Sequence, residues 1–142
     1  MILISHRGNL SGPRPDLENT VEYIDLALAA GYHVEIDVWL EDERYFLGHD
    51  KPETEVSLEY LKNEKFWCHC KNVDALLALL SVGVHCFFHN VDDVTLTSKN
   101  YIWTFPNKKL VNGSACVLPE LGYNGDLSVC TAVCSDYIED YR

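Results

Sequence analysis

Two acidic side chains, Glu35 and Asp37, alternate with branched apolar residues over positions 34–38. On a β-strand, residues two apart point to the same side, so both carboxylates would share one face. Two unpaired acids on an inner face are costly to bury, and a divalent cation that prefers oxygen ligands removes that cost. The same alternation also fits an exposed strand whose polar face lies in water. The pattern therefore leaves a metal site and a solvated strand as alternatives.

Two histidines stand where apolar, strand-like runs stop. His6 is followed by Arg7, and His49 lies in a Gly-His-Asp triplet. Imidazoles titrate near neutral pH and can act as the base and the acid of one displacement. A guanidinium has a planar set of donors that matches phosphate oxygens. Each histidine alone is commonly a surface or capping residue, but together with Arg7 at strand ends they predict acid–base chemistry on a phosphate group.

The elements that must position these residues are short. Runs rich in β-branched or aromatic residues predict strands at 2–5, 33–40, 44–47, 66–70, 84–88, 101–105, 115–118 and 129–134. Apolar spacing predicts helices over 21–30, ended by Gly31, over 57–61 with Ser57 as cap, and over 73–80. Strands and helices alternate in the first half of the chain, and strands predominate in the second.

This order of elements predicts a reduced (β/α)8 TIM-type barrel formed by a single domain of residues 1–142. Such barrels usually have about 200 residues or more. Several outer helices must therefore be missing or shortened, mostly in the C-terminal half. Because their loss would expose apolar surface, we expect a homo-oligomer.

The composition excludes several classes of protein. Of 142 residues, 47% are hydrophobic, which is enough for one core, and the formal net charge is −11 at pH 7. This charge repels polyphosphate backbones and anionic membranes, so no nucleic-acid partner is expected. No apolar run approaches the ~20 residues that span a bilayer, and the N-terminus lacks the basic segment of a secretory signal. We therefore expect a cytoplasmic protein without a membrane anchor.

Six cysteines lie in or beside the apolar runs rather than in loops rich in glycine and proline. In a reducing compartment such thiols behave as small buried apolar groups, so we expect no disulfide. An alternative is a zinc site built from Cys68, His69 and Cys70 with Cys130 and Cys134, although these spacings match no familiar tetrahedral framework.

Four short motifs follow one another between residues 4 and 50. They are Ile4-Ser5-His6-Arg7-Gly8, Glu18-Asn19-Thr20, Glu35-Ile36-Asp37-Val38 and Gly48-His49-Asp50. In order and spacing they resemble the glycerophosphodiester phosphodiesterase family, and Cys70-Lys71-Asn72 and Cys134-Ser135-Asp136-Tyr137 extend the resemblance more weakly. The resemblance implies a TIM-type barrel, a divalent metal ion, and cleavage of a phosphodiester between phosphate and an alcohol.

The resemblance also implies a role for each matching residue. His6 and His49 would be the acid–base pair, and Glu35 and Asp37 would hold the metal. Arg7 would bind the phosphate of the substrate. Glu18 would orient Arg7 or complete the metal site. Lys71 shares the face of the fourth predicted strand that carries His69, where it could neutralise a phosphate oxygen or form a salt bridge to either metal-binding acid.

The chain departs from the family in two places. The family usually has a third metal-binding glutamate two residues before the lysine, where this chain has His69. Either His69 binds a softer ion such as Mn²⁺ or Zn²⁺, or two carboxylates and water hold Mg²⁺ or Ca²⁺. A histidine that is merely paired with a carboxylate is the structural alternative. Family members also carry an insertion after the third strand that covers the substrate, so here we expect an open pocket.

The sequence thus predicts a metal-dependent phosphodiester hydrolase acting on a small glycerophosphodiester-like substrate, with Mg²⁺ or Ca²⁺ as the first expectation for the metal. A catalytically weak module that binds a phosphodiester or phosphate on the same barrel is a second hypothesis, favoured by the missing carboxylate and cover. A lipid-directed lyase that forms a cyclic phosphate is a third. The net acidity and the lack of a basic amphipathic helix weigh against membrane docking.

Overall fold

The computed structural model describes residues 1–142, with ten β-strands, three α-helices and three short 3₁₀ helices. In chain order the elements are β1 (Ile2–His6), α1 (Val21–Ala29), β2 (His33–Glu41), β3 (Arg44–Leu47), β4 (Thr54–Val56), α2 (Leu58–Leu61), β5 (Phe66–Cys70), α3 (Val73–Ser81), β6 (Cys86–Phe88), β7 (Val94–Leu96), β8 (Ile102–Thr104), β9 (Ala115–Val117), η1 (Pro119–Leu121), η2 (Leu127–Val129), β10 (Ala132–Ser135) and η3 (Ile138–Tyr141).

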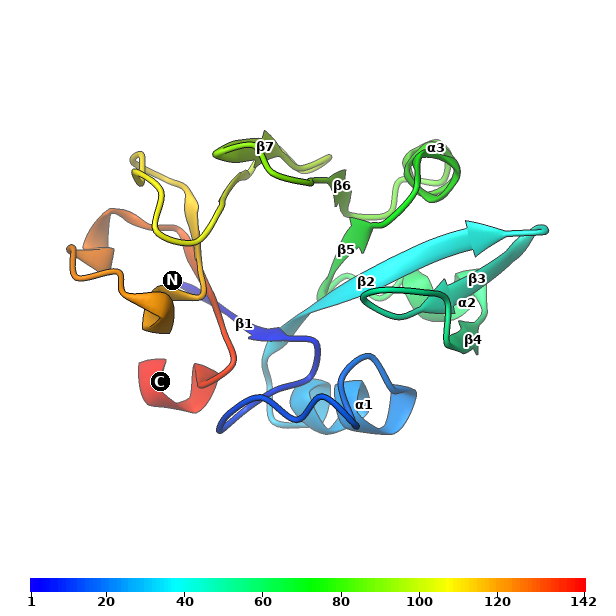
Figure 1. The fold of residues 1–142 in the computed structure, drawn as a ribbon, viewed down its shortest axis with the longest axis horizontal. Helices are drawn as coiled ribbons and strands as arrows, with labels where there is room; N and C mark the ends of the chain where they lie inside the picture. Colours follow the sequence, from blue (N-terminus) through cyan, green and yellow to red (C-terminus); the bar gives the residue numbers. More distant parts are fainter.

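Seven parallel strands form a continuous sheet in the order β6-β5-β2-β1-β10-β9-β8. β7 is antiparallel to β8, and β3 and β4 form an antiparallel extension on the C-terminal half of β2. The sheet curls so that the parallel strands surround a common interior (Figure 1). The edge strands β6 and β7 share no ladder, so the curled sheet stays open.

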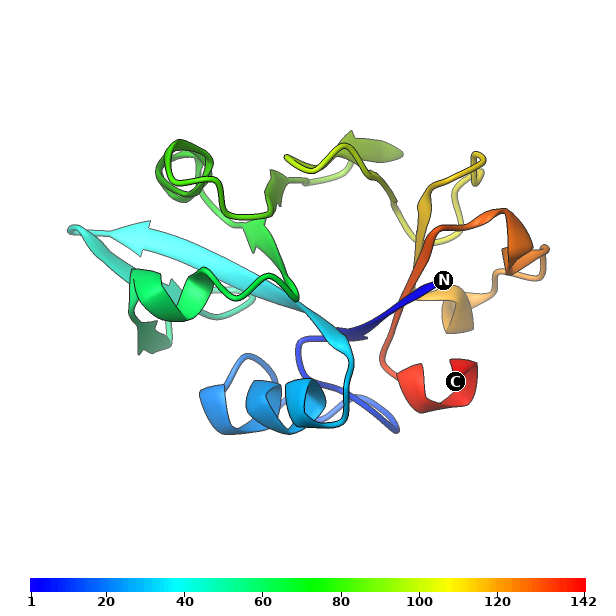
Figure 2. The same ribbon diagram turned by 180° about the vertical axis from the view of Figure 1, so that it is seen from behind.

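The predicted reduced (β/α)8 TIM-type barrel is wrong. The segment predicted as the third barrel strand, β3, runs antiparallel to β2 and lies outside the parallel series. No ladder closes the sheet between β6 and β7, and after α3 the chain has only 3₁₀ helices. Figure 2 shows the consequence from behind: α-helices cover only the side of the sheet formed by the first half of the chain. The fold is a curled, open α/β sheet with few helices.

Most of the predicted elements are confirmed, with ends displaced by at most three residues. Ser57 caps α2 as predicted, because its Oγ accepts the backbone N–H of Tyr60 at 3.1 Å. The three-residue strands β4 and β7 are not among the predicted strands. β10 begins only at Ala132, since residues 127–129 form η2.

The sheet separates two apolar regions. On its outer surface, Val34 and Ile36 of β2 join a core of 14 buried residues under α1 and α3. Inside the curl, a second cluster contains the aromatic rings of Trp67, Phe87 and Trp103. Because successive residues of a strand point to opposite faces, β2 directs its apolar residues outward and its acids into the interior. Glu35 is in register with Trp67, and Asp37 is in register with His69, two residues closer to the C-terminal ends of the parallel strands.

All six cysteines are free and buried, which fits their prediction as small apolar core residues. The alternative zinc site does not form, because Cys68 and Cys70 belong to the outer core whereas His69 between them contacts the interior acids. None of the helices has the length and apolar character needed to cross a membrane. Exposed apolar side chains on α3, including Leu77 and Leu80, offer a surface for the expected homo-oligomer, which stays a prediction.

Candidate active site

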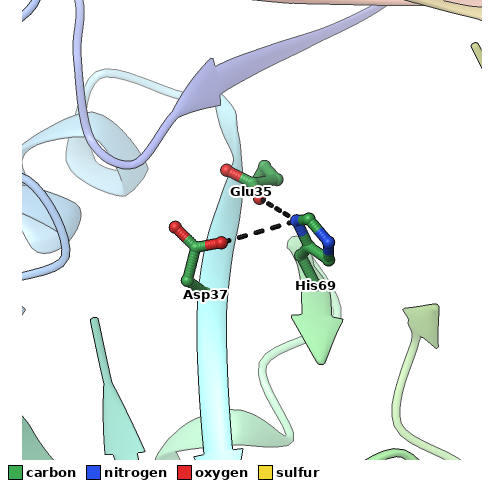
Figure 3. Close-up of side chains that lie close together, drawn as sticks. All are labelled: Glu35, Asp37 and His69. Carbon is green, nitrogen blue, oxygen red and sulfur yellow. Dashed lines mark ion pairs between the residues drawn. The ribbon is translucent and has the colours of Figure 1, made fainter. Parts of the chain in front are cut away.

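Three potential metal ligands converge inside the C-terminal end of the sheet. Glu35 and Asp37 come from β2, and His69 comes from the neighbouring β5, where it pairs in register with Asp37. Nδ1 of His69 lies 3.4 Å from Oε1 of Glu35 and 3.4 Å from Oδ1 of Asp37 (Figure 3). One donor atom from each side chain lies within 4.8 Å of the other two. The register of two parallel strands therefore sets this cluster.

The ring of His69 is held in an orientation that suits a metal ligand. Its Nε2 donates to the carbonyl oxygen of His89 at 2.8 Å, since a carbonyl can only accept. The ring also stacks on Phe87, with 5.0 Å between the centroids. When the imidazole is neutral, Nδ1 carries a lone pair that faces the two carboxylates. A cation among the three side chains would stabilise this arrangement.

Asp37 is completely buried and is held by donors from two connecting segments. Nε of Arg7 lies 3.0 Å from its Oδ2, and Nζ of Lys71 lies 3.5 Å from its Oδ1. Asn19 donates Nδ2–H to Oδ2 at 2.9 Å and accepts the backbone N–H of Asp37 at 3.0 Å. Oδ1, the oxygen that faces His69, accepts no hydrogen bond although it is buried. This oxygen is therefore available to a cation.

Glu35 is the second buried acid, with 2% of its surface exposed. Its Oε2 lies 3.8 Å from Nε2 of His6 and accepts no hydrogen bond. Burial alone would raise the pKa of Glu35, but the contact with His69 and the positive charges of His6 and Arg7 outweigh burial and lower the pKa to about 2. Glu35 is therefore a carboxylate at neutral pH, with one oxygen unpaired.

His6 ends β1 and lies between two acids. Its Nδ1 is 2.7 Å from Oδ1 of Asp136, and its Nε2 faces Glu35. Burial lowers the pKa of His6, but the hydrogen bond to Asp136 and the charge of Glu35 raise it by more, so the net pKa is raised. Asp136 is fixed in turn by Asn9, whose Nδ2 donates to it at 2.8 Å, and by Glu120, which accepts its backbone N–H at 2.8 Å. This network sets the orientation of the His6 ring.

Arg7 is positioned by an unusual backbone conformation. Its φ of 55° is left-handed, which for a non-glycine residue persists only where surrounding contacts enforce it. Its backbone N–H donates to the carbonyl of Glu35 at 2.9 Å, and its carbonyl accepts the N–H of Asn19 at 3.1 Å. Nη1 lies 3.2 Å from Oε2 of Glu18, whose other oxygen accepts from Asn9 at 2.9 Å. Glu18 thus orients Arg7 and lies outside the three-residue ligand cluster.

A polar pocket of about 550 Å³ opens beside this network. Its walls include His6, Arg7, Glu18 and Asp136 from the network, and His49 from the opposite side. The His49 side chain is 45% exposed, and its Nδ1 lies 2.8 Å from Oδ1 of the neighbouring Asp50. The two predicted acid–base histidines therefore face one pocket, one of them buried and the other in contact with solvent.

His49 reaches the pocket through an antiparallel hairpin rather than at the end of a parallel barrel strand. β3 returns along β2, so that the backbone N–H of Gly48 donates to the carbonyl of Asp37 at 3.2 Å. A Cβ atom at Gly48 would overlap the carbonyl oxygen of Lys51, so this turn requires glycine. The Gly-His-Asp triplet thus combines a tight turn with the side chain that it presents.

Seven of the eight predicted site residues form one network of direct contacts: His6, Arg7, Glu18, Glu35, Asp37, His69 and Lys71. His49 shares the pocket with His6 but forms no ion pair with this network. Sequence reasoning assigned no role to Asn9, Asn19 and Asp136. Asn19 and Asp136 stand inside motifs that were recognised, whereas a polar loop residue such as Asn9 carries no distinguishing signal in one sequence.

The arrangement can perform three chemical tasks. The interior cluster can hold a divalent cation, Arg7 and Lys71 can neutralise an anionic group, and the two histidines can exchange protons with a molecule in the pocket.

A comparison of the chain with protein-family models, with curated proteins and with solved structures finds no match in any of the three.

Proposed function

We propose that this protein is a metal-dependent phosphodiester hydrolase that acts on a small, glycerophosphodiester-like substrate. One observation carries the proposal: Oδ1 of Asp37, a buried oxygen without a hydrogen bond, lies with Oε1 of Glu35 next to Nδ1 of His69, and the other oxygen of Glu35, Oε2, faces His6 without a hydrogen bond. A buried carboxylate oxygen left without a partner costs free energy, so its persistence at a site calls for a ligand.

The cluster fits a divalent cation. Neighbouring ligands of one metal ion lie roughly 3 to 3.5 Å apart at metal–ligand distances near 2.1 Å, and both carboxylate contacts of His69 measure 3.4 Å. Two carboxylates suit Mg²⁺ or Ca²⁺, while the imidazole shifts the preference toward Mn²⁺ or Zn²⁺. When bound, such an ion supplies electrostatic stabilisation of the negative charge that develops on the phosphate.

The proton transfers fall to the two histidines. Asp136 holds Nδ1–H of His6, so Nε2 is the atom that exchanges a proton on the side of Glu35. One histidine accepts the proton of the attacking hydroxyl group, and the other protonates the departing alkoxide. His49, at the exposed side of the pocket, suits the alcohol that enters or leaves through solvent.

Arg7 and Lys71 support the binding of the phosphate. Both cations lie within 3.5 Å of Asp37, so they reach the edge of the ligand cluster where a phosphate oxygen would approach. Glu18 fixes the guanidinium plane of Arg7 from the opposite side. The pocket is lined by polar side chains and by Pro13 and Pro15, with Leu118 as its one aliphatic residue, which favours a small polar alcohol over an acyl chain.

The test is hydrolysis of bis(p-nitrophenyl) phosphate and of a glycerophosphodiester with Mg²⁺, Ca²⁺, Mn²⁺ or Zn²⁺ added in turn to metal-free protein. We expect turnover with at least one ion, its loss in EDTA, and its loss in Glu35→Gln. Asp140→Asn is the matched control, because this acid is exposed and lies outside the network. Full turnover in EDTA or in Glu35→Gln would refute the proposal. Phosphorus NMR of the product then separates attack by water from attack by a neighbouring hydroxyl, which leaves a cyclic phosphate.

A catalytically weak phosphate-binding module is the second candidate, and one observation favours it. Asp37 already contacts Arg7 and Lys71, so the cluster approaches neutrality without a bound cation. For this candidate we expect a phosphodiester to bind with no turnover in the presence of any of the four ions. Binding and turnover measured on the same preparation therefore decide between the two functions.

A further inference from the structure

A second pocket lies at the opposite end of the sheet interior. Its volume is about 520 Å³, and its lining includes residues at the starts of the parallel strands: Ile2, His33, Trp67, His85 and Tyr101. No candidate active-site residue lines it. The aromatic layer of Trp67, Phe87 and Trp103 fills the interior next to it. The curled sheet thus has a separate, histidine-lined cavity at the N-terminal ends of its strands.

The two histidines of this pocket present ring N–H groups that have no partner. Nε1–H of Trp67 donates to Nδ1 of His33 at 3.3 Å, so His33 carries its proton on Nε2. Nε2 of His85 lies 2.9 Å from Oγ1 of Thr97, an oxygen that already accepts the backbone N–H of Tyr101. The Thr97 hydroxyl can donate to Nε2 or accept from it, and an anion in the pocket selects the tautomer in which Thr97 donates and His85 carries its proton on Nδ1. Neither of these N–H groups has an acceptor within the protein.

The His85 ring is neutral at physiological pH. Burial lowers the pKa of His85 to about 4, and the positive charge of Lys99 contributes in the same direction. A neutral imidazole at the floor of a pocket is a hydrogen-bond donor that needs no counter-ion. The donors of this pocket therefore persist without a neighbouring acid.

The charge of the lining is the reverse of the charge of the whole chain. Lys62 and Lys99 line the pocket together with one acid, Glu64, whereas the chain carries a net charge of −11. Lys99 forms no ion pair, and Lys62 contacts Glu59 at 3.3 Å. Lys99 is therefore the lysine of the lining that is free to pair with an anion.

Aromatic side chains contribute to the wall of this pocket. The rings of Trp67 and Tyr101 lie 4.8 Å apart between centroids, and those of Trp67 and His85 lie 4.3 Å apart. Trp67 itself is 1% exposed, so the ring of Tyr101 and the side chain of Ile2 are parts of the wall that a ligand can contact. Aromatic surfaces of this kind pack against planar apolar groups.

We propose that this N-terminal pocket is a second binding site, which takes a small planar organic anion. The ring N–H groups of His33 and His85 and the ammonium group of Lys99 bind the anionic group. The planar body packs against Tyr101 and Ile2. The proposal is independent of phosphodiester hydrolysis, since it uses no residue of the candidate active site.

The probe for this site is 2-naphthoate, a planar aromatic carboxylate. Its titration is followed in ¹H–¹⁵N correlation spectra of the histidine rings. We expect saturable shifts of the His33 and His85 signals and none of the His6 and His49 signals, which report on the other pocket. The neutral analogue 2-naphthalenemethanol should bind at least about tenfold more weakly, since it lacks the charge.

Two lysine variants provide the matched comparison. Lys99→Gln should weaken 2-naphthoate binding about two- to fivefold, the effect of one exposed ion pair. Lys109→Gln, an exposed lysine outside the pocket and without an ion pair, should bind as the wild type does. The proposal is overturned by unchanged His33 and His85 signals, by shifts at His6 and His49 instead, or by equal affinities of wild type and Lys99→Gln.

Discussion

The two ends of the sheet interior arise from the same alternation of side chains but contain polar groups of different kinds. At the C-terminal end, Glu35 and Asp37 are charged, buried and surrounded by cations. At the N-terminal end, His33 and His85 each use one hydrogen bond to a neutral partner. The two ends differ because the segments that follow the parallel strands supply counter-charges at the C-terminal end. Arg7 follows β1 and Lys71 follows β5.

Burying ions at the C-terminal end, called the charged end below, costs free energy. Buried ions lose their hydration, and the attraction between them barely repays that loss, so apolar residues of similar volume would often be as stable. Positive φ values at Arg7 and Asn19 add backbone strain at the same place. A costly arrangement that stability does not require is typical of a functional site. The N-terminal end has no ion pair between buried side chains, and the predictions below compare the two ends in order of expected effect.

The largest effect is expected from His6→Ala. Loss of one acid–base group should lower turnover of bis(p-nitrophenyl) phosphate about 10³-fold. Ser57→Ala is the control for general destabilisation, because it removes the α2 cap, costs about 1 kcal/mol and touches no site residue. The measurement is kcat for both variants at matched metal concentration. Wild-type turnover in His6→Ala would show that His6 is not an acid–base group of this reaction.

The next effect concerns stability at the neutral end. The pKa of His85 is about 4 in the folded chain, against 6.5 as its ordinary value. Between these pH values the unfolded chain binds a proton at His85 that the folded chain does not, so folding stability falls as the pH falls. The full difference is about 3 kcal/mol, at about 1.4 kcal/mol per pKa unit.

Urea unfolding of wild type and His85→Gln between pH 7 and pH 4 tests this linkage. The variant should lose less stability than the wild type over that interval, since glutamine does not titrate. The lowered pKa of Glu35 acts in a separate interval, below its ordinary value of 4.5, and affects both chains equally. Parallel pH profiles for the two chains would contradict a neutral, buried His85.

A smaller effect on turnover is expected from Asp136→Asn. Asp136 holds Nδ1 of His6, and loss of its charge should lower kcat about 10- to 100-fold, as for other orienting carboxylates. KM should change by less than about twofold if Asp136 acts only through His6. The exposed Asp140→Asn is the matched control. A raised KM with unchanged kcat would instead make Asp136 a direct contact of the substrate.

The charged end was also the part that the sequence predicted best. Glu35, Asp37 and His69 converge because two neighbouring strands are in parallel register, and the alternation of each strand is visible in the sequence. His6 ends β1 and Arg7 follows it, at a strand end that the sequence marks with Gly8. Local patterns of period two therefore suffice to place side chains on one face, once the neighbouring strand is known.

The closure of the sheet could not be predicted in the same way. The run at 44–47 has the composition of a barrel strand, but whether it pairs parallel or antiparallel depends on the short turn at Asp42 and Glu43, both of which have positive φ. Likewise, nothing local reveals that β6 and β7 stay unpaired. Asn9 and Glu120 fix Asp136 from loops far away in sequence, and such contacts leave no periodic signal.

The smallest effect is expected from Thr97→Val at the N-terminal end. The change removes a hydroxyl group that bonds His85 and accepts the N–H of Tyr101, so the free energy of unfolding should fall by about 1 to 2 kcal/mol. Thr54→Val, which loses no side-chain hydrogen bond, should cost less. Turnover per folded molecule should stay unchanged, because Thr97 contacts nothing at the charged end. A loss of turnover without a loss of stability would show that the two ends are coupled through the aromatic layer between them.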